Sequence, residues 1–227
     1  MPPARFFRMP HRHRWFACLL VVLLAVAGSL QAGWDFARIM ARAEQLYGHS
    51  PAGQQRLQDW QRLLQSQVDQ AERQQLEAVN RFFNQRLRFA DDQQVWGQAD
   101  YWATPVQALQ RGAADCEDYA IAKYFSLRQL GVPSHKLRIT YVKALRLNQA
   151  HMVLTYYPSP GAEPLVLDNL IDAIRPAGQR NDLKPVYAFN AEGLWVPGPQ
   201  GGKQVGDSKR LSRWQDLLKK MQAEGFP

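Results

Sequence analysis

The stretch "GAADCEDYAIAKYFSLRQLGVP" (residues 112–133) carries a helix start, a cysteine and a helix end. Asp115 is a favoured N-cap residue, and Asp118 stands three positions later, as in a short capping box. Gly131 followed by Pro133 is a typical helix end. The stretch therefore predicts a helix over residues 115–130 with Cys116 in its first turn, where the positive end of the helix dipole lowers the pKa of a thiol.

Three segments rich in β-branched and aromatic residues follow this helix, separated by Gly, Pro and Asn. They are Leu137–Val142, His151–Tyr157 and Leu165–Leu170. This pattern predicts an antiparallel meander packed on helices, so the fold class is α+β.

The spacing between the last two segments suggests a register. A four-residue turn over 158–161 pairs Tyr157 with Ala162, and the same register sets His151 opposite Asp168. Directly opposed side chains have Cβ atoms roughly 5 Å apart. At that separation an aspartate can orient an imidazole, which in turn can take the proton of a thiol. Taken alone, each residue also fits a plain strand end or turn.

Helices are predicted on both sides of this region. No Gly or Pro occurs from residue 54 to Phe89, and apolar residues recur there at steps of three or four, which indicates one long helix or two shorter ones. A last helix carries Leu211, Trp214, Leu217, Leu218 and Met221 on one side. We expect it to close the core, with a partner-binding helix as the alternative.

Residues 1–32 have the pattern of a secretory signal peptide, with four arginines ahead of the apolar run Trp15–Ala27 and small residues near Ala32. A membrane anchor is the alternative, but a spanning helix needs roughly 20 apolar residues and this run is shorter. We expect residues 33–227 to form one domain that works outside the cytosol.

Removal of that segment leaves a mildly basic chain with a single thiol. The net charge falls from +8 to +4, which is too small to argue for a nucleic-acid partner. Cys18 is lost as well, so Cys116 has no cysteine with which to form an internal disulfide. Cys116 is then a reactive thiol, half of an intermolecular bridge or an inert core residue.

Three carboxylates surround this thiol, at Asp115, Glu117 and Asp118. Neighbouring anions disfavour a thiolate, whereas carboxylate oxygens are the ligands that calcium prefers. The residues therefore indicate either a calcium site or simple capping of the helix dipole, and the sequence leaves both open. A nucleophilic cysteine also needs a base, and after residue 32 the histidines are His49, His135 and His151.

From about Val79 to Trp195 the chain resembles the bacterial transglutaminase-like cysteine proteases, whose studied members are LapG-like periplasmic proteases of large biofilm adhesins. The resemblance rests on "VNRFFNQRLRF", "VWGQADYWATP", "GAADCEDYAIAKYFSLRQLGVP", "LRITYV", "HMVL" and "LVLDNL", in the order and spacing of the family. It implies a papain-like or transglutaminase-like core with Cys116 as nucleophile, His151 as base and Asp168 as the residue that orients the base. Ala114 replaces the usual Gly of the family.

The resemblance also implies calcium dependence, with Asp115, Glu117 and Asp118 as metal ligands. It implies a periplasmic endopeptidase that cuts the N-terminal region of a large surface adhesin at an Ala-Ala-containing site and so disperses the biofilm. An inner-membrane receptor that senses cyclic di-GMP would sequester it.

Two features of the reaction stay open in the sequence. The backbone N–H of Cys116 is a natural oxyanion donor, and the indole of Trp102 is a candidate for the second donor, although a tryptophan is more often a core residue. A transglutaminase or amidase on the same scaffold, and a non-catalytic calcium-binding or adhesin-binding module, are the alternative functions.

Overall fold

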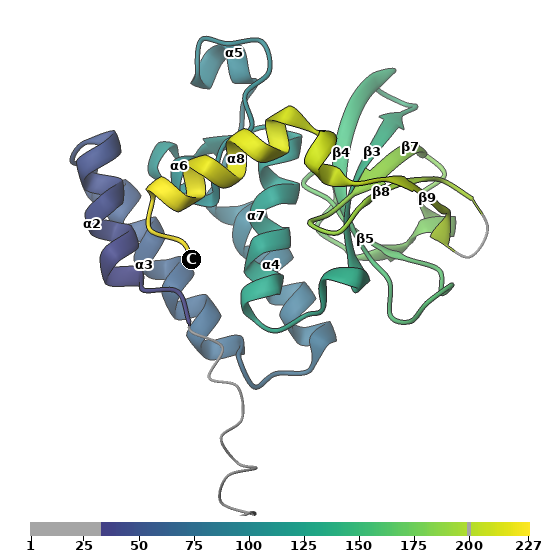
Figure 1. Cartoon of the computed structure of the whole chain (residues 1–227), viewed down its shortest axis with the longest axis horizontal. Coiled ribbons are helices and arrows are strands. Elements are labelled where there is room, and N and C mark those ends of the chain that lie inside the picture. Colours follow the sequence, from purple (N-terminus) through teal and green to yellow (C-terminus); the bar gives the residue numbers. More distant parts are fainter. Residues whose placement is uncertain (1–32, 199–200) are drawn as a thin grey trace, which may run out of the picture. The chain divides into compact units, whose positions relative to one another are not determined.

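The predicted cysteine-bearing helix is α7 (Cys116–Gln129) in the computed structural model, which describes residues 33–198 and 201–227. Asp115 is its N-cap and accepts a hydrogen bond from the Asp118 N–H at 3.5 Å, as the sequence predicted. The helix runs through the middle of the unit formed by Trp34–Pro227, with helices on one side and strands on the other (Figure 1). The proposed signal peptide over 1–32 lies outside the described residues.

The segment after residue 50 forms two helices, α3 (Pro51–Gln67) and α4 (Glu72–Arg86). The first begins earlier than the periodicity alone indicated, because Ser50 caps it by accepting from the Gly53 N–H at 3.1 Å and Pro51 occupies the first helical position. The remaining α-helices of the described chain are α2 (Phe36–Tyr47), α5 (Asp92–Val95), α6 (Pro105–Arg111) and α8 (Ser212–Ala223).

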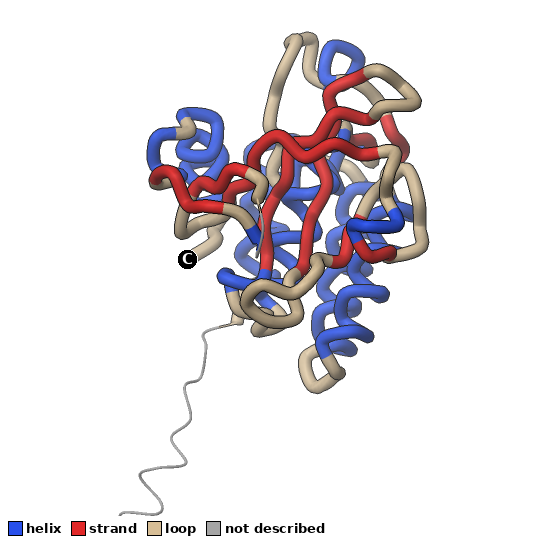
Figure 2. Tube along the Cα trace, turned by 90° about the vertical axis from the view of Figure 1, so that its right-hand side faces the viewer, coloured by secondary structure: helices blue, strands red, loops and turns tan. Residues whose placement is uncertain are grey.

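The predicted meander is the centre of a seven-stranded sheet in which every neighbouring pair is antiparallel. In spatial order its strands are β6 (Arg175–Pro176), β5 (Leu165–Leu167), β4 (Gln149–Tyr156), β3 (Leu137–Ala144), β7 (Leu183–Phe189), β8 (Leu194–Val196) and β9 (Lys203–Gly206). Figure 2 looks onto the sheet and shows the long helices behind its strands. A separate parallel pair, β1 (Arg88–Phe89) and β2 (Ala113–Ala114), leads into α7.

Strand β7 was not among the predicted segments. It contains Pro185, and a proline argues against a central strand. The structure accommodates this residue with an irregularity. Tyr141 pairs with Tyr187 whereas Val142 pairs with Pro185, so the register shifts at this point.

The predicted register between β4 and β5 was wrong by two residues. Tyr156 pairs with Leu165 and Leu154 with Leu167, so Asp168 is level with Val153 and not with His151. The connection between the strands is longer than four residues because it contains three prolines, at 158, 160 and 164, which cannot donate to a ladder. Since a shift of two keeps side chains on the same face, His151 and Asp168 still meet as diagonal neighbours.

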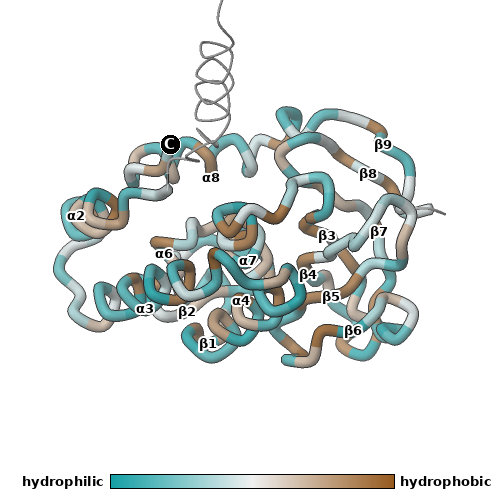
Figure 3. The backbone as a smooth tube through the Cα atoms, turned by 90° about the horizontal axis from the view of Figure 1, so that it is seen from below, coloured by the Kyte–Doolittle hydropathy of each residue, from teal (hydrophilic) through white to brown (hydrophobic). Residues whose placement is uncertain are grey.

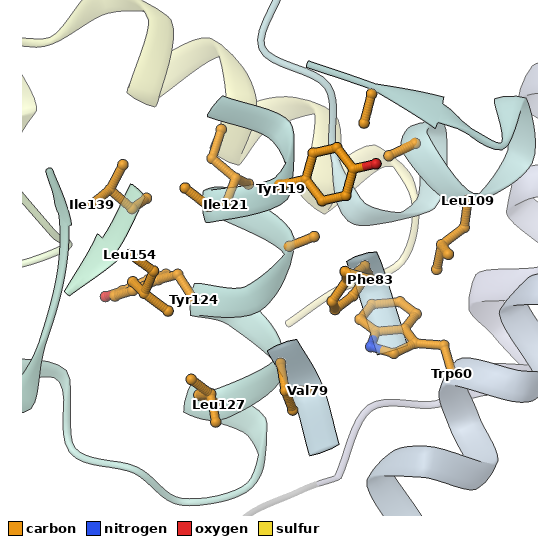
Figure 4. Packing of buried hydrophobic residues seen from close by; sticks show 14 of the residues in the cluster. Trp60, Val79, Phe83, Leu109, Tyr119, Ile121, Tyr124, Leu127, Ile139 and Leu154 are labelled. Atoms are coloured by element: carbon orange, nitrogen blue, oxygen red, sulfur yellow. The ribbon is translucent and has the colours of Figure 1, made fainter. Parts of the chain in front are cut away.

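The core surrounds α7. Figure 3 shows this helix between α3, α4 and α6 on one side and β3 and β4 on the other. In Figure 4, Ile139 and Leu154 lie on the strand side of α7, and Trp60 and Phe83 on the helix side; all four are fully buried. Trp60 also donates from Nε1 to Ser126 Oγ at 2.8 Å, which satisfies the polar atom of a buried indole.

Helix α8 closes this core, as predicted. Its Trp214 is 1% exposed and stacks on Phe125 of α7, with ring centroids 5.5 Å apart and ring planes at 11°. Leu217 and Met221 are buried beside it. Within residues 33–198 and 201–227, none of the helices combines the length and apolar character needed to cross a membrane.

Candidate active site

Cys116 is the first residue of α7, half-buried at the end of the core where α7 meets β4. Its Sγ receives a hydrogen bond from the Met152 amide, and the thiol donates to Glu117 Oε2 at 3.0 Å. Burial raises the pKa of this thiol, and the negative charge and hydrogen bond of Glu117 raise it further. The thiol is therefore protonated in this arrangement, despite its place at a helix N-terminus.

His151 and Asp168 form a buried pair behind the thiol. His151 Nε2 lies 2.8 Å from Asp168 Oδ1, and the two residues are 5% and 1% exposed. Burial alone would raise the pKa of Asp168, but the hydrogen bond and charge of His151, the Leu170 amide and Arg180 outweigh it and lower this pKa to about 2. An ionised Asp168 accepts from the ring, so Nε2 carries the hydrogen and Nδ1 is the nitrogen left for other chemistry.

Cys116 and His151 line the same cleft, which has a volume of about 610 Å³. Half-buried aromatic side chains, among them Tyr141 and Tyr187, form one of its walls, with ring centroids 5.1 Å apart and ring planes at 6°. A smaller cavity of about 250 Å³ on the other face of the sheet contains neither Cys116 nor His151. The larger cleft is therefore the candidate active site. Among the described residues no hydrogen bond joins the thiol to the imidazole.

A cluster of acidic side chains lies beside the thiol, and it is larger than the sequence indicated. Carboxylate oxygens of Asp92, Asp115 and Asp118 approach one another within 4.8 Å, and so do those of Asp92, Asp100 and Glu117. The sequence predicted Asp115, Glu117 and Asp118. Asp92 begins α5 and Asp100 follows it, so the acid-rich linker folds back onto the first turn of α7.

Two observations show that this cluster fits a hard cation. Asp92 Oδ1 and Asp118 Oδ2 are buried and have no hydrogen-bond partner among the described residues. Burial and the neighbouring carboxylates raise the pKa of Asp92 to about 6 and that of Asp115 to about 10, and raise that of Asp118 well above its usual range. Carboxylates brought this close and this deep need positive charge, and calcium takes oxygen ligands of this kind.

Trp102 lies between the acidic cluster and the cleft. Its ring is 8% exposed, lines the cleft and stacks on Phe189 with centroids 5.4 Å apart. The amides on either side of it, of Tyr101 and Ala103, donate to Asp92 Oδ2 and Asp118 Oδ1 respectively. The position is compatible with the predicted oxyanion role, and the side chain also belongs to the core.

Three further residues of the site had weak signals or none in the sequence. Asp92 and Asp100 stood in a linker whose path could not be foreseen, although its acidic character was visible. Arg180, which contacts Asp168, directly follows a short 3₁₀ segment (Ala177–Gln179) after β6 and carries no motif. His49 and His135 do not line the cleft, so His151 is the histidine that the fold brings to the thiol.

The family described as bacterial transglutaminase-like cysteine proteinase matches residues 52–183, which include Cys116, His151 and Asp168. The chain belongs to this family. It is therefore a member of a family of hydrolases with a papain-like or transglutaminase-like α+β fold, as the sequence predicted.

Solved structures of LapG from Legionella pneumophila are similar to this transglutaminase-like proteinase over most of its length. One shares 44% sequence identity, covers 84% of this chain and 99% of its own, and has a TM-score of 0.72. An EGTA-treated structure and a calcium-bound structure share the same identity, with TM-scores of 0.73 and 0.71; they cover 84% and 82% of this chain and 100% and 98% of their own. No curated protein matches the chain.

Proposed function

We propose that this protein is a calcium-dependent cysteine endopeptidase in which Cys116 is the nucleophile, His151 the base and Asp168 the residue that orients the base. The observation that carries the proposal is the buried His151–Asp168 pair at 2.8 Å, in which His151 lines the same cleft as a thiol at a helix N-terminus. The same order and arrangement of these groups is found across papain-like and transglutaminase-like hydrolases.

The reaction uses His151 Nδ1, the ring nitrogen that is not bonded to Asp168. His151 Nδ1 takes the thiol proton, and Sγ then bonds to the peptide carbonyl carbon. The imidazolium gives this proton to the departing amine, which leaves a thioester. Water then attacks the thioester carbon with His151 as base, the acid product leaves, and the proton returns to Sγ. Asp168 stays ionised throughout and stabilises the imidazolium.

We assign the oxyanion donors to the start of α7 and to the loop before α6. We assign one donor to the Cys116 backbone N–H, which has no partner within a helix at this position. We assign the second to the indole of Trp102, because it lines the cleft and its neighbouring amides are anchored to Asp92 and Asp118.

The acidic residues would hold the metal ion, with Asp92 and Asp100 added to the predicted Asp115, Glu117 and Asp118. Calcium, when bound, supplies the positive charge that offsets these carboxylates. Glu117 has a second part in this scheme because it accepts the hydrogen bond of the thiol. Release of this hydrogen bond frees the thiol to donate to His151.

The substrate, location and partner are proposed from the similarity to LapG and its family. We assign cleavage of the N-terminal region of a large surface adhesin at an Ala-Ala-type site, in the periplasm, after removal of residues 1–32. Release of the adhesin promotes biofilm dispersal, and an inner-membrane receptor with a periplasmic domain that responds to cyclic di-GMP controls the protease. A net charge of +4 after residue 32 supports no nucleic-acid partner.

Cleavage of an adhesin N-terminal fragment tests the proposal. The wild-type protein is compared in calcium and in EGTA, next to Cys116→Ala and His151→Gln. Cleavage in calcium alone, absent in both variants, supports the proposed reaction. Cleavage that survives Cys116→Ala rules out the nucleophile, and equal cleavage in EGTA rules out the metal dependence.

Addition of a primary amine to the same reaction separates a protease from an acyl transferase. A protease releases two fragments with free termini, whereas a transferase on the same residues gives an amide-linked amine adduct of the fragment. Mass spectrometry of the products distinguishes the two. A protein that binds the fragment without changing it would be the non-catalytic module.

A further inference from the structure

Asp168 is held from two sides. His151 contacts its Oδ1, and Arg180 donates from Nη2 to its Oδ2 at 2.8 Å. Arg180 is 3% exposed, so this is a buried ion pair and not a surface contact. A buried, charge-assisted hydrogen bond fixes the carboxylate much more strongly than an exposed one.

The guanidinium is itself fixed in place. Arg180 Nε and Nη2 both donate to Asp182, at 3.0 and 2.8 Å. The backbone around it is equally constrained, because the Arg180 N–H donates to Ala177 O and its carbonyl accepts from the Leu183 N–H, both at 2.9 Å. Arg180 therefore presents Nη2 to Asp168 from a rigid turn between β6 and β7.

The charges around Asp168 come from three elements. His151 approaches from β4, Arg180 from the turn before β7, and Lys123 from α7, where its ammonium is fully buried and has no hydrogen-bond partner among the described residues. Burial lowers the pKa of Lys123 to about 7, against the charges of Asp168 and Asp172. Arg180 keeps its charge, because Asp182 and Asp168 offset the effect of burial and raise its pKa.

We propose that Arg180 is a positioning residue of the active site, which holds Asp168 by its second oxygen and thereby sets the orientation and the proton affinity of His151. The inference rests on the proposed function. A carboxylate bound through one oxygen alone can rotate, and a rotated Asp168 would release the imidazole from the direction of Cys116. The positive charge of Arg180 also weakens the pull of Asp168 on the imidazole proton.

The sign of this electrostatic effect separates it from a structural role. Loss of a positive charge beside Asp168 favours the imidazolium, so Arg180→Met raises the pKa of His151. A charge one carboxylate away shifts such a pKa by about one to two units at an effective dielectric constant of about 20. Asp168→Asn moves the same pKa in the opposite direction, because it removes a negative charge from the ring.

The experiment compares Arg180→Met and Arg180→Lys with a matched control, Arg175→Met. Arg175 lies five residues earlier and is exposed, and its replacement by Met removes the same charge. Imidazole titrations by NMR, with the His151 signal assigned from His151→Gln, are measured in calcium and in EGTA. The values of kcat and KM for the adhesin fragment are measured in calcium.

We expect Arg180→Met to lower kcat by about tenfold or more with little change in KM, and to raise the His151 pKa by about one to two units. Arg180→Lys keeps the charge and should show less than half of that pKa shift. Arg175→Met should match the wild type in both. An Arg180→Met protein with the wild-type His151 pKa and kcat overturns the proposal, and so does an equal shift in Arg175→Met.

The imidazole titration tests the role of Arg180 independently of the cleavage assay. If Cys116→Ala cleaves as well as the wild type, the proposed function fails, but the imidazole titration still measures whether Arg180 acts on His151 through Asp168. If Arg180→Met does not fold, as judged by thermal unfolding, Arg180→Lys decides. A wild-type kcat for Arg180→Lys at an unchanged His151 pKa would mean that a positive charge near Asp168 is sufficient for activity. It would overturn the proposal that the guanidinium positions Asp168.

Discussion

Replacement of Asp115 by Asn should stabilise the calcium-free protein. Burial and the charges of Asp118, Glu117 and Asp92 raise the Asp115 pKa to about 10 from 3.8, so at pH 7 this carboxyl is protonated when folded and ionised when unfolded. Because this carboxyl is partly exposed, that difference destabilises the folded state by about 2 kcal/mol. Asn carries no such penalty, and it caps a helix as well as Asp does.

The assay is thermal unfolding at pH 7 in EGTA and in calcium. A gain of about 2 kcal/mol raises Tm by roughly 4–8 °C in a domain of this size. In calcium the order should reverse, because a metal at about 100 times its Kd adds about 2.7 kcal/mol to a protein that keeps all its ligands. Asp69→Asn, at an exposed position, is the control. An Asp115→Asn protein that is less stable than the wild type in EGTA would refute this reasoning.

Further predictions concern pH, the cleft and the core. In EGTA, the contribution of Asp92 to stability is complete below about pH 4 and is lost as the pH rises through about 6, the value to which its pKa is raised; Asp92→Asn should flatten this part of a pH–Tm curve. Trp102→Phe should lower kcat by about 10²-fold at similar KM, and a loss below twofold would exclude the oxyanion role. Lys220→Met, which removes the donor to the Trp102 carbonyl, should lower kcat and change the tryptophan emission spectrum, whereas Lys219→Met on the exposed face should not. Leu109→Ala should destabilise the fold by about 2–5 kcal/mol in urea titrations, because truncation of this fully buried side chain leaves a cavity in the core.

Local patterns predicted the elements that carry the chemistry. Asp115, Gly131 and Pro133 gave the bounds of α7 to within one residue, since capping is decided by a few neighbouring atoms. The central strands were found for the same reason, because they alternate with turns rich in Gly and Pro. Strand β7 was missed, since its fitness as a strand depends on an irregularity in β3 pairing that no local signal announces.

The candidate site was predictable in its residue types but not in its full membership. Cys116, His151 and Asp168 could be inferred from spacing and from the resemblance, even though the register that joined the last two was wrong. Asp92 and Arg180 could not, because Asp92 begins the short helix α5 and Arg180 follows a 3₁₀ turn, each in a connection between longer elements. Long-range contacts of this kind depend on the path of the chain between elements, which composition and periodicity do not encode.

Helix α8 follows the proposed catalytic residues in the chain and also holds part of the cleft. Its Lys220 and Glu224 hold the loop around Trp102 through the Trp102 carbonyl and the Thr104 hydroxyl. Because a ribosome synthesises this helix after Cys116, His151 and Asp168, a growing chain contains every proposed catalytic group before it contains the clamp on that loop. In an emerging chain, the loop around Trp102 therefore lacks both of these hydrogen bonds until residues 212–224 have been made and have packed on it.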